Sequence, residues 1–320
     1  MFAQLRRQEI EGNFLVANRR SVWIVIALLV ASLAAWRGYA QYRDQTQRTA
    51  ALVESFVASI ATAEQSAKQL RVVIFDDKEG HAERIGNLTS ILGSAVKFNC
   101  GPITADEILS GGLSDADIIV FPGGSGRQQA KLLGSRGKKI VRDFIEGGGG
   151  YVGICAGAYL GTCVSETGLA VADARYLTGK VMVEGEGMRS ISARGKGTVE
   201  IQMTNAGQTV LGYEQLPIQV TYGGGPVLSP GRSPEIDDYV VLARYSTEVW
   251  SFKAQKGTMV DTPAIVASNF GNGRVILVSP HLEMTPGLEA MVKRIMFAAA
   301  PLSSEEERKS IANNDKARKD

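Results

Sequence analysis

The sequence predicts an α/β fold in which a parallel sheet carries helices on both faces. Short apolar runs at 70–75, 118–121 and 151–154 have the length of buried strands, and helical patterns separate them. Strands that alternate with helices favour a parallel sheet, and right-handed crossovers place the helices on both faces. The 320 residues, 44% of them hydrophobic and 21% charged, are enough for one large domain with appendages.

The elements that separate these strands can be assigned in order. Helices are predicted over 82–92, 104–109 and 127–146, and a further strand near 96–99. Thr104 and Glu107 have the spacing of a capping box, which is typical of a helix start. The four glycines 147–150 end the third helix before the strand 151–154 begins.

Between about Val171 and Ser246 the pattern changes, and it predicts a β-rich insertion or an extension of the sheet edge. Short β-like runs at 198–203, 217–221 and 239–244 are separated by glycine and proline.

The last part of the domain is predicted to contain a hairpin and a helix. Strands at 263–269 and 274–278 flank Gly271-Asn272-Gly273, which is a hairpin signal. Thr285 and Pro286 are expected to begin a helix with one apolar stripe. The domain therefore covers 70–300, and a charged tail follows at 301–320.

An apolar run near the N-terminus predicts a membrane-anchor helix. Residues 21–36 carry no charge and lie between Arg20 and Arg37. At about 1.5 Å per residue the run spans about 24 Å, and flanking arginines can extend its reach toward a roughly 30 Å hydrocarbon core. Because more arginines precede the run than follow it, we expect residues 1–20 inside, a single-pass anchor at 21–40 and the main domain outside the cytoplasm. Secretion after signal cleavage is the alternative, since alanines follow the run.

The segment 41–69 predicts an amphipathic helix that either forms a stalk or packs on the domain. Its apolar residues recur at helical spacing, namely Leu52, Val53, Phe56, Val57 and Ile60.

Charge and cysteine content narrow the possible ligands. A formal net charge of +2 argues against a dominant nucleic-acid surface. Neither C-x-x-C nor paired-histidine spacing occurs, so we expect no metal site and no cofactor. Cys100 and Cys163 either form a disulfide in an oxidising compartment or, as the sequence favours, stay as two buried free thiols. The sequence leaves a homo-oligomer open.

Cys155 is the candidate nucleophile, because it lies between Gly153 and Gly157 directly after a predicted strand. A sharp strand-to-helix turn presents such a side chain, and neighbouring chain segments leave room only for residues without a Cβ. The N-terminus of the following helix favours the thiolate. The alternative is a buried cysteine that packs a tight turn.

A cysteine nucleophile needs a base, and the chain has two histidines, His81 and His281. His281 follows the strand 274–278, and in extended backbone Glu283 would lie on the same face and orient the ring. His81 follows the first strand in a polar loop, where a helix start is the better interpretation.

Two glycine-rich loops are expected beside this cysteine. Loops at the carboxyl ends of parallel strands meet at one edge of the sheet. The backbone N–H groups of Gly123 or Gly124, together with that of Ala156, are therefore candidates for an oxyanion hole, against the alternative of an ordinary turn. The loop that begins at Tyr222 is a candidate for close approach to a substrate, through Tyr222 and Gly224.

The order of these motifs resembles a known family. The motifs are Pro122-Gly123-Gly124, Gly153-Ile154-Cys155-Ala156-Gly157-Ala158-Tyr159, Tyr222-Gly223-Gly224-Gly225-Pro226 and His281-Leu282-Glu283. Over roughly 70–300 the chain resembles the biotin-protein ligase N-terminal domain family, within the class I glutamine amidotransferase-like superfamily. The resemblance implies a flavodoxin-like fold and a Cys-His-Glu triad, which falls on Cys155, His281 and Glu283. Two departures stand out: Tyr159 replaces the Gln usual in glutaminase domains, and no segment resembles a biotin-binding loop, so biotinylation is not expected.

Two functions follow from this sequence. The first is a membrane-anchored, cysteine-dependent amidase or amidotransferase-like hydrolase that acts on a small amide or γ-glutamyl-type compound, with Tyr159 among the substrate-binding residues. The second is a ligand-binding or regulatory module that keeps the same turn without turnover.

Overall fold

The structure is a computed structural model that describes residues 2–77, 82–164, 168–192, 194–214 and 216–302. The side chains of 2–29, 33 and 41 lie outside that description, as do His81 and residues 303–320 of the predicted tail. The chain divides into two compact units, residues 1–51 and residues 52–320.

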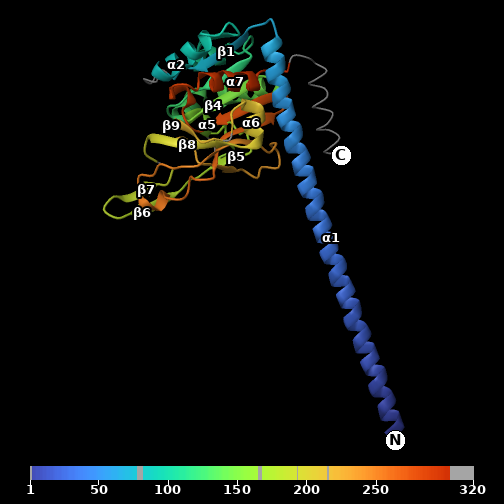
Figure 1. Cartoon of the computed structure of the whole chain (residues 1–320). Helices are drawn as coiled ribbons and strands as arrows, with labels where there is room; N and C mark the ends of the chain where they lie inside the picture. Colours follow the sequence, from blue (N-terminus) through green and yellow to red (C-terminus); the bar gives the residue numbers. More distant parts are fainter. Residues whose placement is uncertain (1, 78–81, 165–167, 193, 215, 303–320) are drawn as a thin grey trace. The chain divides into compact units, whose positions relative to one another are not determined.

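A nine-stranded sheet forms the centre of the second unit (Figure 1). Five neighbouring strands are parallel, in the order β2 (Phe98–Ile103), β1 (Leu70–Phe75), β3 (Ile118–Phe121), β4 (Gly150–Ile154) and β13 (Gly273–Val278). Four antiparallel strands continue the sheet, in the order β12 (Pro263–Phe270), β11 (Val240–Tyr245), β8 (Gly197–Met203) and β9 (Ile218–Tyr222). The parallel half has the 2-1-3-4-5 order of flavodoxin-like folds. Strands of the predicted β-rich region extend the edge of this same sheet.

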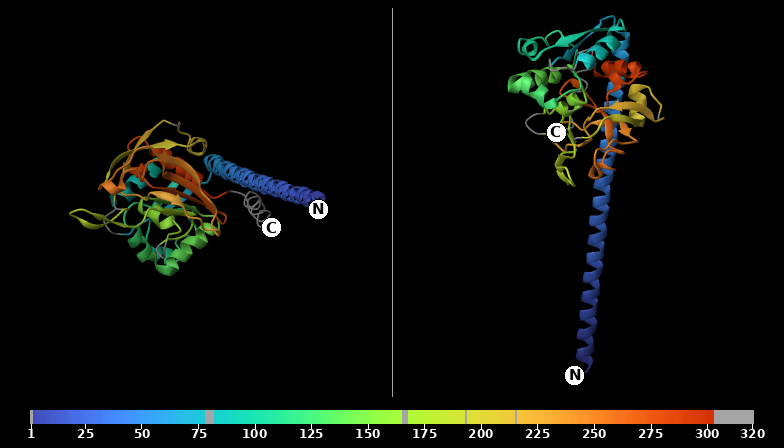
Figure 2. Two further views of the ribbon diagram at one scale, coloured as in Figure 1. Left: turned by 90° about the horizontal axis from the view of Figure 1, so that it is seen from below. Right: turned by 90° about the vertical axis from the view of Figure 1, so that its left-hand side faces the viewer.

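Helices cover both faces of the sheet, as predicted. Along β1, Val72 and Ile74 face one core, which holds buried residues of α2 (Ala82–Gly93) and α7 (Glu289–Ala299). The alternating residues Val73 and Phe75 face the other core. That second core is closed by α3 (Ala105–Leu109), α4 (Gly126–Glu146) and α5 (Ala156–Gly161). In the left view of Figure 2, the green helix α4 lies along one side of the strands.

The end of the first helix belongs to the sheet domain. Helix α1 (Phe2–Gln65) buries Phe56 and Ile60 completely or nearly so in the first core, at 0% and 2% exposure. The buried guanidinium of Arg274 donates hydrogen bonds to the hydroxyls of Ser55 and Ser59, at 2.8 and 3.2 Å. For residues 52–65, packing on the domain is therefore the correct alternative to a free stalk.

Within the part of the chain that the structure describes, no helix is long and apolar enough to cross a membrane. The anchor predicted at 21–40 is not confirmed, and half of its side chains lie outside the description.

Several short elements were not predicted. They are α6 (Asn205–Leu211), the pair β5 (Ala174–Tyr176) with β10 (Leu228–Pro230), the hairpin β6 (Lys180–Val183) with β7 (Gly187–Ser190), and the 3-10 turns η1 (Lys253–Gln255) and η2 (Leu282–Met284). Helix α7 also begins at Glu289 and not at Thr285, because Thr285 is hydrogen-bonded to the preceding turn and Gly287 adopts φ +86°. Cys100 and Cys163 are free thiols, as favoured, although both are half-buried.

Candidate active site

The predicted site residues follow three neighbouring strands at one edge of the sheet. Strands β3, β4 and β13 lie side by side in parallel. Gly123 follows β3, Cys155 follows β4 and His281 follows β13. The predicted convergence of these three segments is confirmed.

Cys155 lies on a sharp turn between β4 and α5, with φ +50° and ψ −95°. Its backbone N–H donates a 2.8 Å hydrogen bond to the Val278 carbonyl of β13. A Cβ placed on Gly157 would lie 2.1 Å from the Phe121 carbonyl oxygen, and one on Gly153 would lie 2.4 Å from the Gly157 carbonyl oxygen. These distances are too short for any side chain, so the flanking glycines have the steric role that the sequence predicts.

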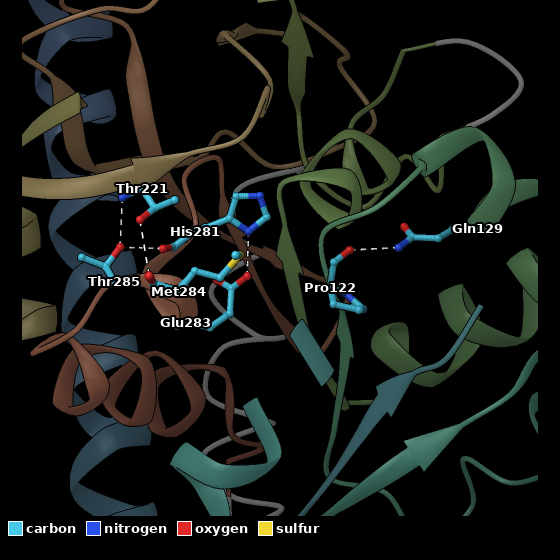
Figure 3. A network of polar contacts seen from close by, with 7 residues as sticks. All are labelled: Pro122, Gln129, Thr221, His281, Glu283, Met284 and Thr285. Atoms are coloured by element: carbon cyan, nitrogen blue, oxygen red, sulfur yellow. Dashed lines mark hydrogen bonds and ion pairs between the residues drawn. The ribbon is translucent and has the colours of Figure 1, made fainter. Parts of the chain in front are cut away.

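His281 forms a buried pair with Glu283, as expected, but through a different backbone. Its Nδ1 lies 2.7 Å from Glu283 Oε1 (Figure 3). The expected extended backbone was wrong, because residues 282–284 form the 3-10 turn η2. His281 itself precedes this turn with φ −102° and ψ 84°, and this local backbone brings the Glu283 carboxylate to the ring.

The electrostatics of His281 favour its protonated form. Burial lowers the pKa of the ring, but hydrogen bonds with the side chains of Cys155 and Glu283, and the charges of these two groups, outweigh burial and raise the pKa to about 10. Because Glu283 occupies Nδ1, Nε2 is the nitrogen available to the thiol. Helix α5 has only six residues, so the imidazolium is a larger source of positive charge for Cys155 than the helix terminus.

Two threonines that the sequence did not indicate hold the backbone of His281 in place. The His281 N–H donates to the Thr221 carbonyl of β9 at 2.8 Å. The Thr285 hydroxyl donates to the His281 carbonyl at 2.7 Å and accepts the Thr221 N–H at 3.0 Å. Figure 3 shows both threonines on the backbone side of His281. No local motif marks Thr221, because its partner lies sixty residues further along the chain.

Two glycines lie against the imidazole ring. A Cβ on Gly123 would lie 2.4 Å from Cε1 of His281, and a Cβ on Gly223 would lie 2.8 Å from its Nε2. Both glycine-rich loops thus make room for the ring, a role that the sequence did not reveal.

The loop proposed for the oxyanion hole is ordered against the Cys155 turn. The Gln129 side-chain amide donates to the Pro122 carbonyl at 2.9 Å (Figure 3). A Cβ on Gly126 would lie 3.0 Å from the Ala156 carbonyl oxygen. Gly124, with φ +147°, occupies a backbone conformation that favours glycine.

The predicted substrate-binding residues lie beside the thiol. The Tyr159 hydroxyl donates to the Gly224 carbonyl at 3.2 Å, and the Tyr222 hydroxyl donates to the Gly225 carbonyl at 2.7 Å. Burial raises the pKa of both phenols, and the charge of Cys155 adds to this effect. Both rings are therefore neutral hydrogen-bonding groups near Cys155. Among the described residues, no group of three or more His, Cys, Asp or Glu side chains is placed to hold a metal ion.

The flavodoxin-like strand order and the cysteine turn beside a His–Glu pair are the features that the sequence resemblance implies. The chain belongs to the family described as "Biotin-protein ligase, N terminal", which it matches over residues 72–320.

Comparison with solved structures gives distant similarities. A β-galactosidase from Rahnella sp. R3 is 13% identical and superposes with a TM-score of 0.47; the match covers 72% of this chain and 31% of the β-galactosidase chain. A ThuA-like protein from Parabacteroides merdae is 12% identical with a TM-score of 0.45, covering 74% of this chain and 93% of its own. A cytoplasmic protein from Salmonella typhimurium is 12% identical with a TM-score of 0.45, covering 73% and 100%. The chain spans about a third of the β-galactosidases it matches. No curated protein matches it.

Proposed function

We propose that the chain is a cysteine-dependent amidase or amidotransferase-like hydrolase that acts on a small amide or γ-glutamyl-type substrate. The observation that carries the proposal is the buried His281–Glu283 pair, 2.7 Å apart, whose imidazole also interacts with the side chain of Cys155. A cysteine that merely packs a turn needs no such partner. A nucleophile needs a base, and the base needs a group that orients it.

The proposed reaction is an acyl transfer in two steps. The Cys155 sulfur attacks the amide carbonyl carbon, and the thiol proton is held on His281. The oxyanion accepts hydrogen bonds from backbone N–H groups of Gly123 or Gly124 and of Ala156. The C–N bond then breaks, and His281 gives its proton to the leaving amine. Water attacks the resulting thioester while His281 accepts a proton from the water. The C–S bond then breaks, His281 returns this proton to the Cys155 sulfur, and a carboxylic acid is released.

Alkylation by iodoacetamide near neutral pH tests whether Cys155 is activated. The rate at each cysteine is followed by peptide mass spectrometry, and His281→Ala should slow the reaction of Cys155 alone. Cys100 and Cys163 are internal controls, because both are half-buried free thiols and burial raises the pKa of each. Equal rates at Cys155 in the two proteins would exclude an activated pair. Since the Cys155 side chain is only 5% exposed, rates are compared between variants and not between cysteines.

Turnover is tested separately with a set of small amides and γ-glutamyl amides. We expect release of ammonia or amine and a thioester on Cys155 that is trapped by acid quenching. Cys155→Ser should abolish the thioester adduct. Tight reversible binding that survives Cys155→Ser, with no product formed, would instead identify a binding module.

A further inference from the structure

Arg194 is a buried cation whose hydrogen-bond partners in the described part of the chain are all uncharged. Its side chain is 7% exposed. Nη1 donates to the carbonyls of Val249 and Gln255 at 3.1 and 3.4 Å, and Nη2 donates to the Thr258 hydroxyl. Its Nε is buried and has no hydrogen-bond partner within the described part of the chain.

This arrangement is unusual for a guanidinium. A buried charge is normally paired with an opposite charge, because removing it from water costs far more than neutral hydrogen bonds restore. No carboxylate among the described residues forms an ion pair with Arg194. An anion that reached Nε would gain a charge-assisted hydrogen bond and would balance this charge.

The backbone of Arg194 lies beside the candidate active site. A Cβ on Gly224 would be 3.9 Å from the Arg194 carbonyl oxygen, and the preceding Gly223 lies against the His281 ring. The positive charge of Arg194 opposes the rise in the pKa of both Tyr159 and Tyr222 that burial causes, and the same two phenols are affected by Cys155. Arg194 and the thiol therefore act on the same two side chains.

We propose that Arg194 binds a carboxylate carried by the substrate whose carbonyl carbon is attacked by Cys155. One unpaired N–H suits a single carboxylate oxygen, whereas a phosphate normally draws on several donors. The inference rests on the proposed function and narrows it to amides that bear a carboxylate, a class that includes γ-glutamyl compounds.

Two alkylating reagents of similar size test this charge preference. Iodoacetate carries a carboxylate and iodoacetamide carries a neutral amide, and the ratio of their rates at Cys155 is the readout. Arg194→Gln should lower the iodoacetate-to-iodoacetamide ratio by about tenfold, the equivalent of one charge-assisted hydrogen bond. Arg194→Lys, which keeps the charge, should retain most of the ratio.

Arg142→Gln is the matched control, because Arg142 also donates to backbone carbonyls, those of Leu169 and Ala170. The iodoacetate-to-iodoacetamide ratio of this variant should equal that of the unaltered protein. A purely structural role for Arg194 would lower thermal stability in Arg194→Gln and leave the ratio unchanged, and that result would overturn the proposal.

A measurement on the unaltered protein covers the case in which Arg194 variants do not fold. At constant ionic strength, succinate should slow the reaction of Cys155 with iodoacetamide more than succinamide does. Equal rates with the two compounds would contradict the proposal. The inference and the proposed function fail separately: unchanged reactivity in His281→Ala removes the activated pair, whereas an unchanged reagent ratio in Arg194→Gln removes the carboxylate site.

Discussion

Replacing Gly123 by alanine should displace the His281 ring. The added Cβ would lie 2.4 Å from Cε1 of His281 and 3.1 Å from Cδ of Arg84. Carbon atoms in contact are about 3.5–4.0 Å apart, so the ring has to move by about 1 Å or more. The 2.7 Å bond from Nδ1 to Glu283 and the bond to Cys155 do not both survive such a shift. Misplacement of a catalytic group by about 1 Å lowers rates by about 100-fold.

The assay is the iodoacetamide rate at Cys155 together with amide turnover where a substrate is found, and thermal unfolding reports the fold. Overpacking of this kind lowers the free energy of unfolding by about 1–3 kcal/mol, so Gly123→Ala should stay folded while its thiol loses reactivity. Gly101→Ala is the control, since no atom lies within 4 Å of a Cβ at Gly101 in β2. Unchanged reactivity of Cys155 in a folded Gly123→Ala protein would refute the geometry deduced for the ring.

Three further predictions concern pH, packing and the N-terminal segment. The pKa of His281 is raised to about 10 in the folded state from 6.5, so its contribution to stability is complete below about pH 6.5 and is lost as the pH rises through about 10. Denaturant titrations at several pH values should show this loss of unfolding free energy in the unaltered protein. The same dependence of the unfolding free energy on pH in His281→Gln would contradict the prediction. Phe56→Ala should lower the free energy of unfolding by about 3–5 kcal/mol, whereas Tyr42→Ala should leave it unchanged because Tyr42 is 70% exposed. Equal effects of the two substitutions would argue against the packing of Phe56. Deleting residues 1–40 should move the protein from the membrane pellet to the supernatant, and an identical distribution would disprove an anchor at 21–40.

The parallel half of the fold could be predicted because its signals are local. The capping box of Thr104 and Glu107 is present in full, and the strand 118–121 has the predicted bounds. The hairpin around Gly271 is also confirmed. Buried parallel strands are continuous apolar runs bounded by turn residues, so composition alone marks them.

The antiparallel half was harder because its pairing is non-local. Helix α6 is short and opens with Thr204 as its N-cap, inside a region that is otherwise β-like. The hairpin of β6 and β7 has largely exposed residues and therefore shows no core-facing pattern.

The residue types and the chain order of the candidate site could be predicted from the sequence. Cys155, His281 and Glu283 follow from chain order and chemistry, and the structure brings them together. What the sequence could not give is the three-dimensional environment of the ring, because Gly223 and Thr221 reach His281 only through the pairing of β8 with β9 and the bridge to β9.

The backbone of Cys155 has a consequence for the evolution of this domain. Holding a residue with a Cβ at φ +50° and ψ −95° disfavours the native state by about 1–3 kcal/mol, and glycine at the same position would relieve most of that penalty. Selection for greater thermostability would therefore favour replacement of Cys155 by glycine. If the proposed function is correct, a relative that has lost the reaction should readily exchange this cysteine for glycine, and the residue at this position would separate relatives that react from those that only bind.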